Sequence, residues 1–284
     1  MPELPEVETI RRGLGKFILN KKIVQVKVLE KKSFICEEEG FLKQGWKVAN
    51  LRRFGKALVV DLEGGFSMMI HLRMTGQLIW QGKETRFAAG HPSENFVAEL
   101  PNKQTRVVFE FEDGKLFFND QRKFGFVKVL KTTEVERDEF IRNLAKEPWE
   151  MTVSELAKQF KRHKSSAVKA VILDQKVICG LGNIYADELL FYAGIHPEAK
   201  AGNLSEKQIE KLLEGARKVM QESIDSGGST MATYVRADGS RGDYLEKFAK
   251  VFRKEGTPCP KCGTIIKKIR VAGRGTHICP ECQK

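Results

Sequence analysis

The chain has 284 residues, of which 41% are hydrophobic, so it can form about two globular domains and is not a disordered polymer. Its 49 Lys and Arg outnumber 37 Asp and Glu, and the resulting net charge of +12 favours a polyanionic partner. No apolar run approaches the ~20 residues of a membrane span, and the acidic start lacks the order of a signal peptide, so we expect no membrane partner and a cytoplasmic protein.

The chain opens with MPELPEVETI, which predicts a helix from about Pro5 to Phe17. Pro5 suits a first helical turn, and Glu6 and Glu8 suit the positive end of the helix dipole. Pro2 and Glu3 are not explained by helix formation. If Met1 is removed, Pro2 becomes the N-terminus and exposes a secondary amine, a nucleophile that no other position of a polypeptide offers.

Apolar residues then alternate with a period of two, from about residue 23 to residue 130, in short runs separated by turns such as Asp113-Gly114. These repeated strands after one helix predict an N-terminal β-sandwich or barrel domain over residues 1–133. The stretch from Gln81 to Gln104 is rich in Gly, Pro and charge and has no period, so it is predicted to be a long loop between strands.

From about Thr132 the apolar spacing changes to three and four, which predicts a helical domain over residues 134–228. Within it, Gly180-Leu181-Gly182 joins two helices, and Asn183 is a natural N-cap for the second. The N–H groups at such a helix start, with the basic KRHKSS segment upstream, indicate a phosphate site. The glycine-rich residues 229–245 are predicted to be a mobile loop.

Four cysteines form a metal-binding pattern near the C-terminus, namely Cys259, Cys262, Cys279 and Cys282. Two C-x-x-C pairs around a plausible hairpin predict a four-cysteine zinc ribbon over residues 246–284, with one structural Zn²⁺ per chain. Arg274 lies between two glycines at the turn of this hairpin, where its guanidinium is either a phosphate ligand or an ordinary solvated side chain.

Several residues of the strand region are predicted to point outward from loops: Lys56, Met74, Arg122 and Phe124. Taken singly, the methionine and the phenylalanine fit core packing, and the arginine fits a solvated surface. Together, a methionine, an arginine and a phenylalanine are the residue types that wedge into a base stack and replace an extruded base.

In combination these motifs resemble the bacterial formamidopyrimidine-DNA glycosylase family of base-excision repair. The resemblance runs through PELPEVET, FGK, HLRMTG, QRKFG, LDQKVICGLGNIYADE, GGST and the cysteine ribbon. It implies an α+β multidomain fold, in which a β-sandwich with a leading helix precedes a helix-two-turn-helix domain and a zinc-ribbon hairpin. It also implies a monomeric enzyme of the bacterial cytoplasm and nucleoid that removes oxidised purines, preferably opposite cytosine, and then cleaves duplex DNA by β,δ-elimination.

The resemblance implies roles for individual residues. Pro2 would form a Schiff base with the damaged nucleotide, Glu3 would act as the general acid, and Lys56 as a second acid and phosphate contact. Arg274 would grip phosphates and assist the δ-elimination. The implied DNA contacts are His71, Met74, Arg122, Phe124, Lys164, Asn183, Ser229 and Tyr234, the last two from the loop that would cover an everted base.

The chain departs from the family pattern at Gln104-Thr105-Arg106, which replaces a His-x-His pair that includes a DNA contact. Gln104 can hydrogen-bond a phosphate but has no titratable group. The alternative functions are an endonuclease VIII-like glycosylase for oxidised pyrimidines and a catalytically silent protein that binds damaged DNA. PELPEVET and the separate Met74 and Arg122-x-Phe124 favour the purine enzyme, and the presence of Pro2, Glu3 and Lys56 argues against a silent one.

Overall fold

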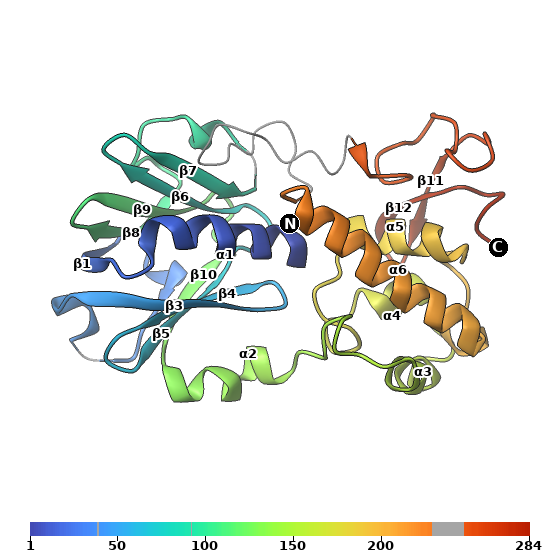
Figure 1. Ribbon diagram of the computed structural model, residues 1–284, viewed down its shortest axis with the longest axis horizontal. Helices are drawn as coiled ribbons and strands as arrows, with labels where there is room; N and C mark the ends of the chain where they lie inside the picture. The colour runs from blue at the N-terminus through green and yellow to red at the C-terminus, as the bar shows by residue number, and fades with distance from the viewer. Residues whose placement is uncertain (39, 92, 229–246) are drawn as a thin grey trace. The chain divides into compact units, whose positions relative to one another are not determined.

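The computed structural model describes residues 1–38, 40–91, 93–228 and 247–284 (Figure 1). The described residues divide into two compact units, one with residues 1–142 and 226–228 and the other with 143–225 and 247–284. Ser229, Tyr234 and the predicted loop over 229–245 lie outside the described residues. Among the described helices, none has the length and apolar character that a membrane crossing requires.

Within the described residues, ten strands of the first unit share one hydrogen-bonded order, β2-β10-β5-β4-β3-β1-β8-β9-β6-β7. Neighbours are antiparallel except for β2 and β10. The strands are β1 (Lys22–Val28), β2 (Phe34–Ile35), β3 (Trp46–Phe54), β4 (Ala57–Leu62), β5 (Phe66–His71), β6 (Gly76–Gly82), β7 (Arg86–Gly90), β8 (Thr105–Phe111), β9 (Gly114–Asp120) and β10 (Phe126–Lys131).

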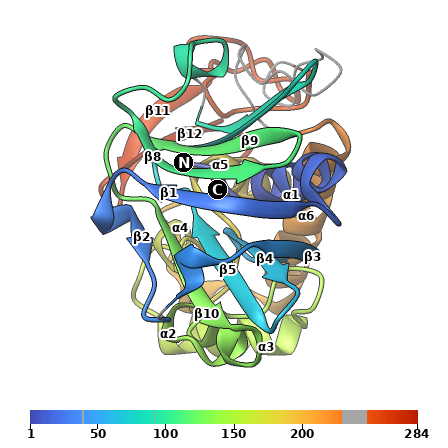
Figure 2. The same cartoon turned by 90° about the vertical axis from the view of Figure 1, so that its left-hand side faces the viewer.

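One layer consists of β2, β10, β5, β4 and β3, and the other of β1, β8, β9, β6 and β7. The two layers form a β-sandwich, which confirms the predicted fold of the N-terminal region (Figure 2). They are joined by a short pairing of β1 with β3, in which Ile23 lies opposite Trp46. Both halves contribute to one hydrophobic core, for example Val60 from one half and Phe109 from the other. Burial of this shared apolar surface is what holds the two layers together.

Helix α1 (Leu4–Ile18) packs against β3, β4 and β7 and adds its apolar face to the same core. Val7, Ile10 and Leu14 recur at a spacing of three and four and are all buried. The helix begins with a capping box, because the Glu6 carboxylate accepts a hydrogen bond from the Glu3 backbone N–H at 2.8 Å. The helix predicted from Pro5 to Phe17 is confirmed.

The prediction of an irregular loop from Gln81 to Gln104 was wrong for part of that range. Residues 86–90 form β7, which pairs with β6, and residues 94–96 form the short 3₁₀ helix η3 (Glu94–Phe96). Phe87, Ala88 and Ala89 are all buried. The strand was missed because a strand without an exposed face lacks the polar–apolar alternation on which the prediction relied.

The first unit extends further along the chain than the predicted boundary between residues 133 and 134. The 3₁₀ helix η4 (Thr132–Arg137) and helix α2 (Glu139–Arg142) belong to this unit. Val135 and Ile141 pack in one apolar cluster with Ala57 and Met69 of the sheet. The helical spacing is present at residues 134–142, but its apolar face is covered by strands rather than by other helices.

The second unit contains helices and a two-stranded hairpin. The elements are α3 (Val153–Arg162), α4 (Val168–Ile172), α5 (Asn183–Ala193), η5 (Ala201–Asn203), α6 (Glu206–Asp225), β11 (Lys267–Val271) and β12 (Arg274–Ile278). The turn before α5 is ordered by Gln175, whose side chain accepts from the Gly180 N–H at 3.0 Å and donates to the Leu181 carbonyl at 2.9 Å. Gly180 has a φ of +93°, which favours glycine.

Asn183 is the first residue of α5, and Gly182 occupies the N-cap position. The predicted N-cap role of Asn183 was therefore wrong. Its side-chain Nδ2 instead donates to the carbonyl oxygen of Gly275 at 3.0 Å, so this side chain ties the helix start to the hairpin.

Candidate active site and nucleic-acid interface

Pro2 and Glu3 lie at the N-terminal end of α1, and both are buried, whereas Met1 is 46% exposed. The positive charge of the N-terminus lies close enough to His91 to lower its pKa, although burial is the larger cause of that shift. Removal of Met1 would place the Pro2 amine beside a buried carboxyl group, an arrangement suited to nucleophilic attack with proton transfer.

Glu8 holds α1 to strand β3 through a cluster of arginines. Its carboxylate binds Arg11 and Arg12 at 2.7 Å each and Arg53 at 3.1 Å. Burial works against the charged form, but the hydrogen bonds from Arg11 and Arg12 and the charges of Arg11 and Arg53 outweigh it, and the pKa of Glu8 is lowered to about 2. The carboxylate is therefore ionised at neutral pH.

The same cluster supports the turn that carries Lys56. Arg53, which binds Glu8, also donates to the carbonyl oxygen of Gly55 at 3.1 Å. Gly55 has a φ of +55°, and Lys56 follows it with 7% of its surface exposed, so the prediction that Lys56 points outward was wrong. Glu8 and Arg53 thus connect the helix that begins with Pro2 and Glu3 to the turn of Lys56.

His71 lies at the end of β5 and is buried, with 4% exposed. Its ring stacks on Phe126 and meets Phe140 edge-on, with centroids 5.9 and 5.0 Å away. Burial, with the charges of Arg73 and Lys56, lowers its pKa to about 3. Its Nδ1 accepts from the Arg73 N–H at 3.1 Å, so His71 is neutral and carries its proton on Nε2.

Met74, Arg122 and Phe124, here called the wedge, are exposed loop residues, as predicted. Met74 and Phe124 are 39% and 55% exposed, so both side chains present apolar surface to solvent. The Arg122 guanidinium lies over the Phe124 ring, 4.8 Å from its centroid. The wedge therefore presents a flat cation and two apolar groups to solvent.

Asp120 connects the two loops that carry the wedge. This carboxylate is 1% exposed and accepts hydrogen bonds from the N–H groups of Arg122 at 3.2 Å and Gly125 at 2.7 Å. It also accepts from the hydroxyl of Thr75, the neighbour of Met74. Thr75 in turn accepts from the Arg122 N–H at 3.1 Å. One buried carboxylate thus fixes both loops.

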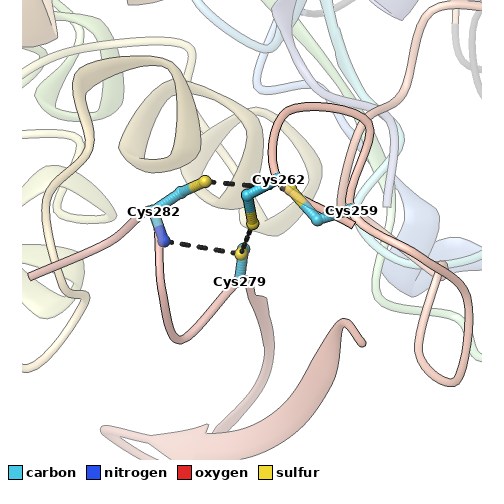
Figure 3. A group of neighbouring side chains, drawn as sticks. All are labelled: Cys259, Cys262, Cys279 and Cys282. Carbon is cyan, nitrogen blue, oxygen red and sulfur yellow. Dashed lines mark hydrogen bonds between the residues drawn. The ribbon is translucent and has the colours of Figure 1, made fainter. Parts of the chain in front are cut away.

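The four predicted zinc ligands come together in the second unit, and Figure 3 shows the four cysteine side chains side by side. Their sulfur atoms lie within 4.8 Å of one another, and the Cys259–Cys282 and Cys262–Cys279 pairs are 3.8 and 3.4 Å apart. A tetrahedral zinc with bonds of 2.3 Å needs sulfurs roughly 3.8 Å apart. The cluster fits one structural Zn²⁺, and four thiolates leave no position for a substrate.

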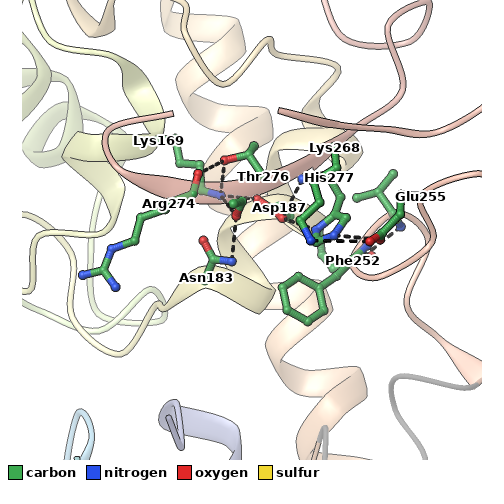
Figure 4. A network of polar contacts seen from close by, with 12 residues as sticks. Lys169, Asn183, Asp187, Phe252, Glu255, Lys268, Arg274, Thr276 and His277 are labelled. Carbon is green, nitrogen blue, oxygen red and sulfur yellow. Dashed lines mark hydrogen bonds and ion pairs between the residues drawn. The ribbon is translucent and has the colours of Figure 1, made fainter. Parts of the chain in front are cut away.

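A buried ion pair docks the hairpin of β11 and β12 on helices α4 and α5 (Figure 4). Lys169 and Asp187 are both 0% exposed, and Lys169 Nζ lies 2.6 Å from Asp187 Oδ1. Lys169 also donates to the Thr276 hydroxyl at 2.7 Å and to the Gly275 carbonyl at 3.3 Å. Asp187 Oδ2 accepts from the His277 N–H at 2.9 Å. The backbone after Arg274 is therefore held by both members of the ion pair, through the Gly275 carbonyl and the His277 N–H.

Arg274 itself is exposed and points away from this network, as Figure 4 shows. The turn before it consists of Ala272 and Gly273, whose φ angles are +48° and +75°. Lys164 is also exposed, on the segment after α3. In the second unit the structure brings Arg274 and Asn183 together through Gly275, and it leaves the Lys164 side chain in solvent.

Comparisons with known proteins agree with this arrangement. Family models match in three consecutive segments: the formamidopyrimidine-DNA glycosylase N-terminal domain at residues 1–127, the formamidopyrimidine-DNA glycosylase H2TH domain at 144–235 and the zinc finger found in FPG and IleRS at 256–284. Formamidopyrimidine-DNA glycosylases of Listeria innocua and Desulfitobacterium hafniense are 40% and 38% identical over the whole of both chains.

The chain belongs to the formamidopyrimidine-DNA glycosylase family. A solved structure of a Lactococcus lactis FPG mutant with DNA containing Fapy-dG is 32% identical and superposes with a TM-score of 0.88 over all of both chains. Another, of the wild-type Lactococcus lactis protein with DNA containing an oxidised pyrimidine, has 31% identity and a TM-score of 0.86. The family has DNA glycosylase and AP lyase activity.

Sequence reasoning missed the residues that hold the candidate site residues in place: Asp120, Arg53, Lys169 and Asp187. Asp120 directly precedes the QRKFG motif, so its position at the end of a strand and the start of a functional loop was an available signal. The pairing of Lys169 with Asp187 had no comparable signal, because both residues lie among apolar helix positions.

Proposed function

We propose that this chain, acting as a monomer, removes oxidised purines such as 8-oxoguanine and formamidopyrimidines from duplex DNA and then cleaves the strand. Its family membership supports the substrate class. The observation that carries the chemistry is the burial of Pro2 and Glu3 at the start of α1, connected through Glu8 and Arg53 to the buried Lys56.

The reaction proposed for Pro2 begins after removal of Met1. The Pro2 nitrogen attacks C1′ of the damaged nucleotide, a C–N bond forms and the glycosidic bond breaks, and the base leaves with a proton. Glu3 protonates the ribose ring oxygen, the ring opens, and a secondary amine necessarily gives a cationic iminium. An α-amino group with a pKa of about 7.7–8.0 is partly neutral at pH 7, as attack requires.

The iminium then acts as an electron sink for strand cleavage. Loss of the C2′ proton expels the 3′ phosphate, and a further proton loss expels the 5′ phosphate, which leaves a one-nucleotide gap. Lys56 is assigned to a flanking phosphate and to proton transfer, and Arg274 to phosphates around the lesion and to the second elimination.

The wedge is assigned to the space that the everted nucleotide leaves. Met74 and Phe124 replace lost stacking, and the Arg122 guanidinium donates hydrogen bonds to the orphaned base, which is cytosine opposite 8-oxoguanine. Lys164 and Asn183 are assigned to phosphates, and the neutral His71 can contribute only an uncharged Nε2–H to the DNA.

Borohydride trapping tests this function. The protein is incubated with a duplex that carries 8-oxoguanine opposite cytosine, the imine is reduced, and the cross-linked peptide is identified by mass. An adduct on Pro2, with Met1 absent, supports the mechanism. Tight binding of the lesion without an adduct or cleavage would mean that the chain recognises damage without cutting it.

Oxidised pyrimidines are the second candidate substrate class, because a relative was solved with DNA containing an oxidised pyrimidine. Excision rates on duplexes with thymine glycol and with 8-oxoguanine, measured side by side, separate the two classes. A faster rate on thymine glycol would overturn the proposed purine preference.

A further inference from the structure

His91 lies directly after β7, at the end of the sandwich where β6 begins. Its backbone N–H donates to the carbonyl oxygen of Gly76 at 3.0 Å, and its carbonyl oxygen accepts from Nε2 of the buried Gln77. Gly90, which precedes it, has a φ of +114°, and a Cβ atom there would lie 2.4 Å from the Gly76 carbonyl oxygen. Backbone atoms of His91 therefore fix its position, independently of its side chain.

The chain that leaves β7 runs toward the start of α1. Phe87 of β7 lies against Gly13 of the helix, where an added Cβ atom would be 2.5 Å from the phenyl ring. Figure 1 shows the arrow of β7 pointing toward the end of α1 that carries the N-terminus. His91 follows Phe87 along this direction, so it lies toward Pro2 rather than toward the C-terminal end of the helix.

The wedge loops are supported at the same end of the sheet. Gly76, which accepts from the His91 N–H, lies opposite Asp120 in the pairing of β6 with β9. Asp120 is the buried carboxylate that accepts from Thr75 and from the Arg122 N–H. His91 is therefore anchored beside both parts of the candidate site in the first unit, the N-terminal amine and the base of the wedge.

The charges that act on the His91 ring agree with this position. Burial is the largest cause that lowers its pKa, the positive N-terminus lowers the pKa further, and the Asp120 carboxylate raises it. The half-buried ring is therefore neutral at pH 7, and one of its nitrogens can accept a proton. Among the residues that the structure describes, none is hydrogen-bonded to this ring.

Iminium formation at Pro2 needs a proton acceptor that none of the residues assigned above supplies. When Pro2 attacks C1′, its nitrogen keeps the proton of the secondary amine and becomes a charged tertiary ammonium. The iminium forms only after this proton leaves, because the freed electron pair makes the C=N bond. Glu3 and Lys56 are assigned as proton donors, so a separate group must accept.

We propose that His91 is a further catalytic residue, whose neutral imidazole accepts the proton of the Pro2 nitrogen after the attack on C1′. The N–H bond of the proline breaks and an N–H bond of the imidazole forms. The freed electron pair makes the iminium while the C1′–O4′ bond breaks and O4′ takes the proton of Glu3. The imidazolium is stabilised by the Asp120 charge, and its half-buried ring returns the proton to water. This inference rests on the proposed amine chemistry of Pro2.

Chemical rescue tests this role. His91→Ala removes the imidazole but keeps both backbone anchors, so its affinity for a duplex with tetrahydrofuran, an uncleavable abasic-site analogue, should be unchanged. The single-turnover rates of 8-oxoguanine excision and of borohydride trapping should fall about 100-fold. Added imidazole should restore part of both rates, whereas pyrazole, a ring of the same size but a much weaker base, should not. Thermal unfolding checks that the variant is folded.

Two further variants define what is lost. His91→Gln keeps a polar side chain that cannot act as a base, so it should be as slow as His91→Ala. His196→Ala is the matched control, because His196 is a half-buried histidine of the second unit whose Nδ1 accepts from the Glu198 N–H at 3.3 Å. It should cut at the normal rate with or without imidazole. A normal excision rate of His91→Ala, or a loss that imidazole does not restore, would overturn the proposal.

Failure of this inference is distinguishable from failure of the proposed function. Borohydride trapping of the chain without substitutions is measured in parallel, and its mass shows that Met1 is absent. If this chain forms the Pro2 adduct and His91→Ala forms it equally fast, the assignment of His91 is wrong while the glycosylase function stands. If the chain without substitutions forms no adduct, the proposed function is wrong, and the role of His91 as its base is overturned with it.

Discussion

A single nitrogen atom, that of Pro2, determines whether the proposed chemistry can occur. Pro2→Gly replaces the secondary amine by a primary one at the same buried position, so the single-turnover excision rate should fall at least tenfold. Pro5→Gly, in the first turn of α1, is the matched control and should lower stability rather than the chemical step. Excision by Pro2→Gly at the normal rate would contradict the assignment.

A second prediction concerns the pH dependence of stability and rests on His71. Its pKa is lowered to about 3 in the folded chain, whereas an ordinary histidine titrates near 6.5. Below pH 6.5 the unfolded chain binds a proton that the folded chain does not, so the free energy of unfolding falls as the pH drops toward 3. The slope from this residue is at most about 1.4 kcal/mol per pH unit.

Urea unfolding between pH 4 and pH 8 measures this effect. His71→Asn should have a shallower pH dependence than the unmodified chain between pH 4 and pH 6, and the same dependence between pH 7 and pH 8. Equal slopes over the acid range would mean that His71 is not buried in its neutral form.

At the scale of elements, Asp120 should control the two wedge loops together. Asp120→Asn loses one of the acceptors for the Arg122 and Gly125 N–H groups, so the rate of 8-oxoguanine excision should fall about tenfold. Affinity for undamaged duplex should change little, because the phosphate contacts remain. Asp113→Asn, at the exposed β8–β9 turn, is the matched control. An equal loss of the excision rate and of the affinity for undamaged duplex would indicate general misfolding instead.

The docking of the hairpin on α4 and α5 depends on Lys169 and Asp187. Lys169→Met leaves a buried carboxylate without its cation, which should cost about 3–5 kcal/mol of unfolding free energy in the second unit. Adding Asp187→Leu removes the uncompensated charge and should restore a large part of this loss. Chemical denaturation of the single and double variants measures both steps. A double variant no more stable than Lys169→Met would contradict the ion-pair interpretation.

At the scale of the whole molecule, zinc should affect the second unit and not the first. A strong chelator should remove one Zn²⁺ per chain, disorder the hairpin that carries Arg274 and weaken DNA binding. The sandwich core should persist, because it has no metal ligands among its described residues. Metal analysis and circular dichroism check these outcomes. Cys279→Ser should lose the metal, whereas the matched Cys36→Ser should keep it.

The sequence by itself determined what depends on local spacing and on short motifs. Helix α1, most strands of the sandwich and the zinc ligands follow from periods of 3.6 and two and from the C-x-x-C pairs. Their physical signal lies within a few consecutive residues. The exposed positions of Met74, Arg122 and Phe124 were predicted in the same way, from motifs at strand ends.

Only the tertiary structure decided how those parts are supported. Strand β7 has no exposed face, so its pairing with β6 left no alternation to read. The Lys169–Asp187 pair, and the hydrogen bonds from Asn95 to Gln77 and Gln104, join residues from different elements. Such partners are chosen by the geometry of packed elements and by the need to satisfy every buried polar group. Spacing along the chain carries no information about that choice.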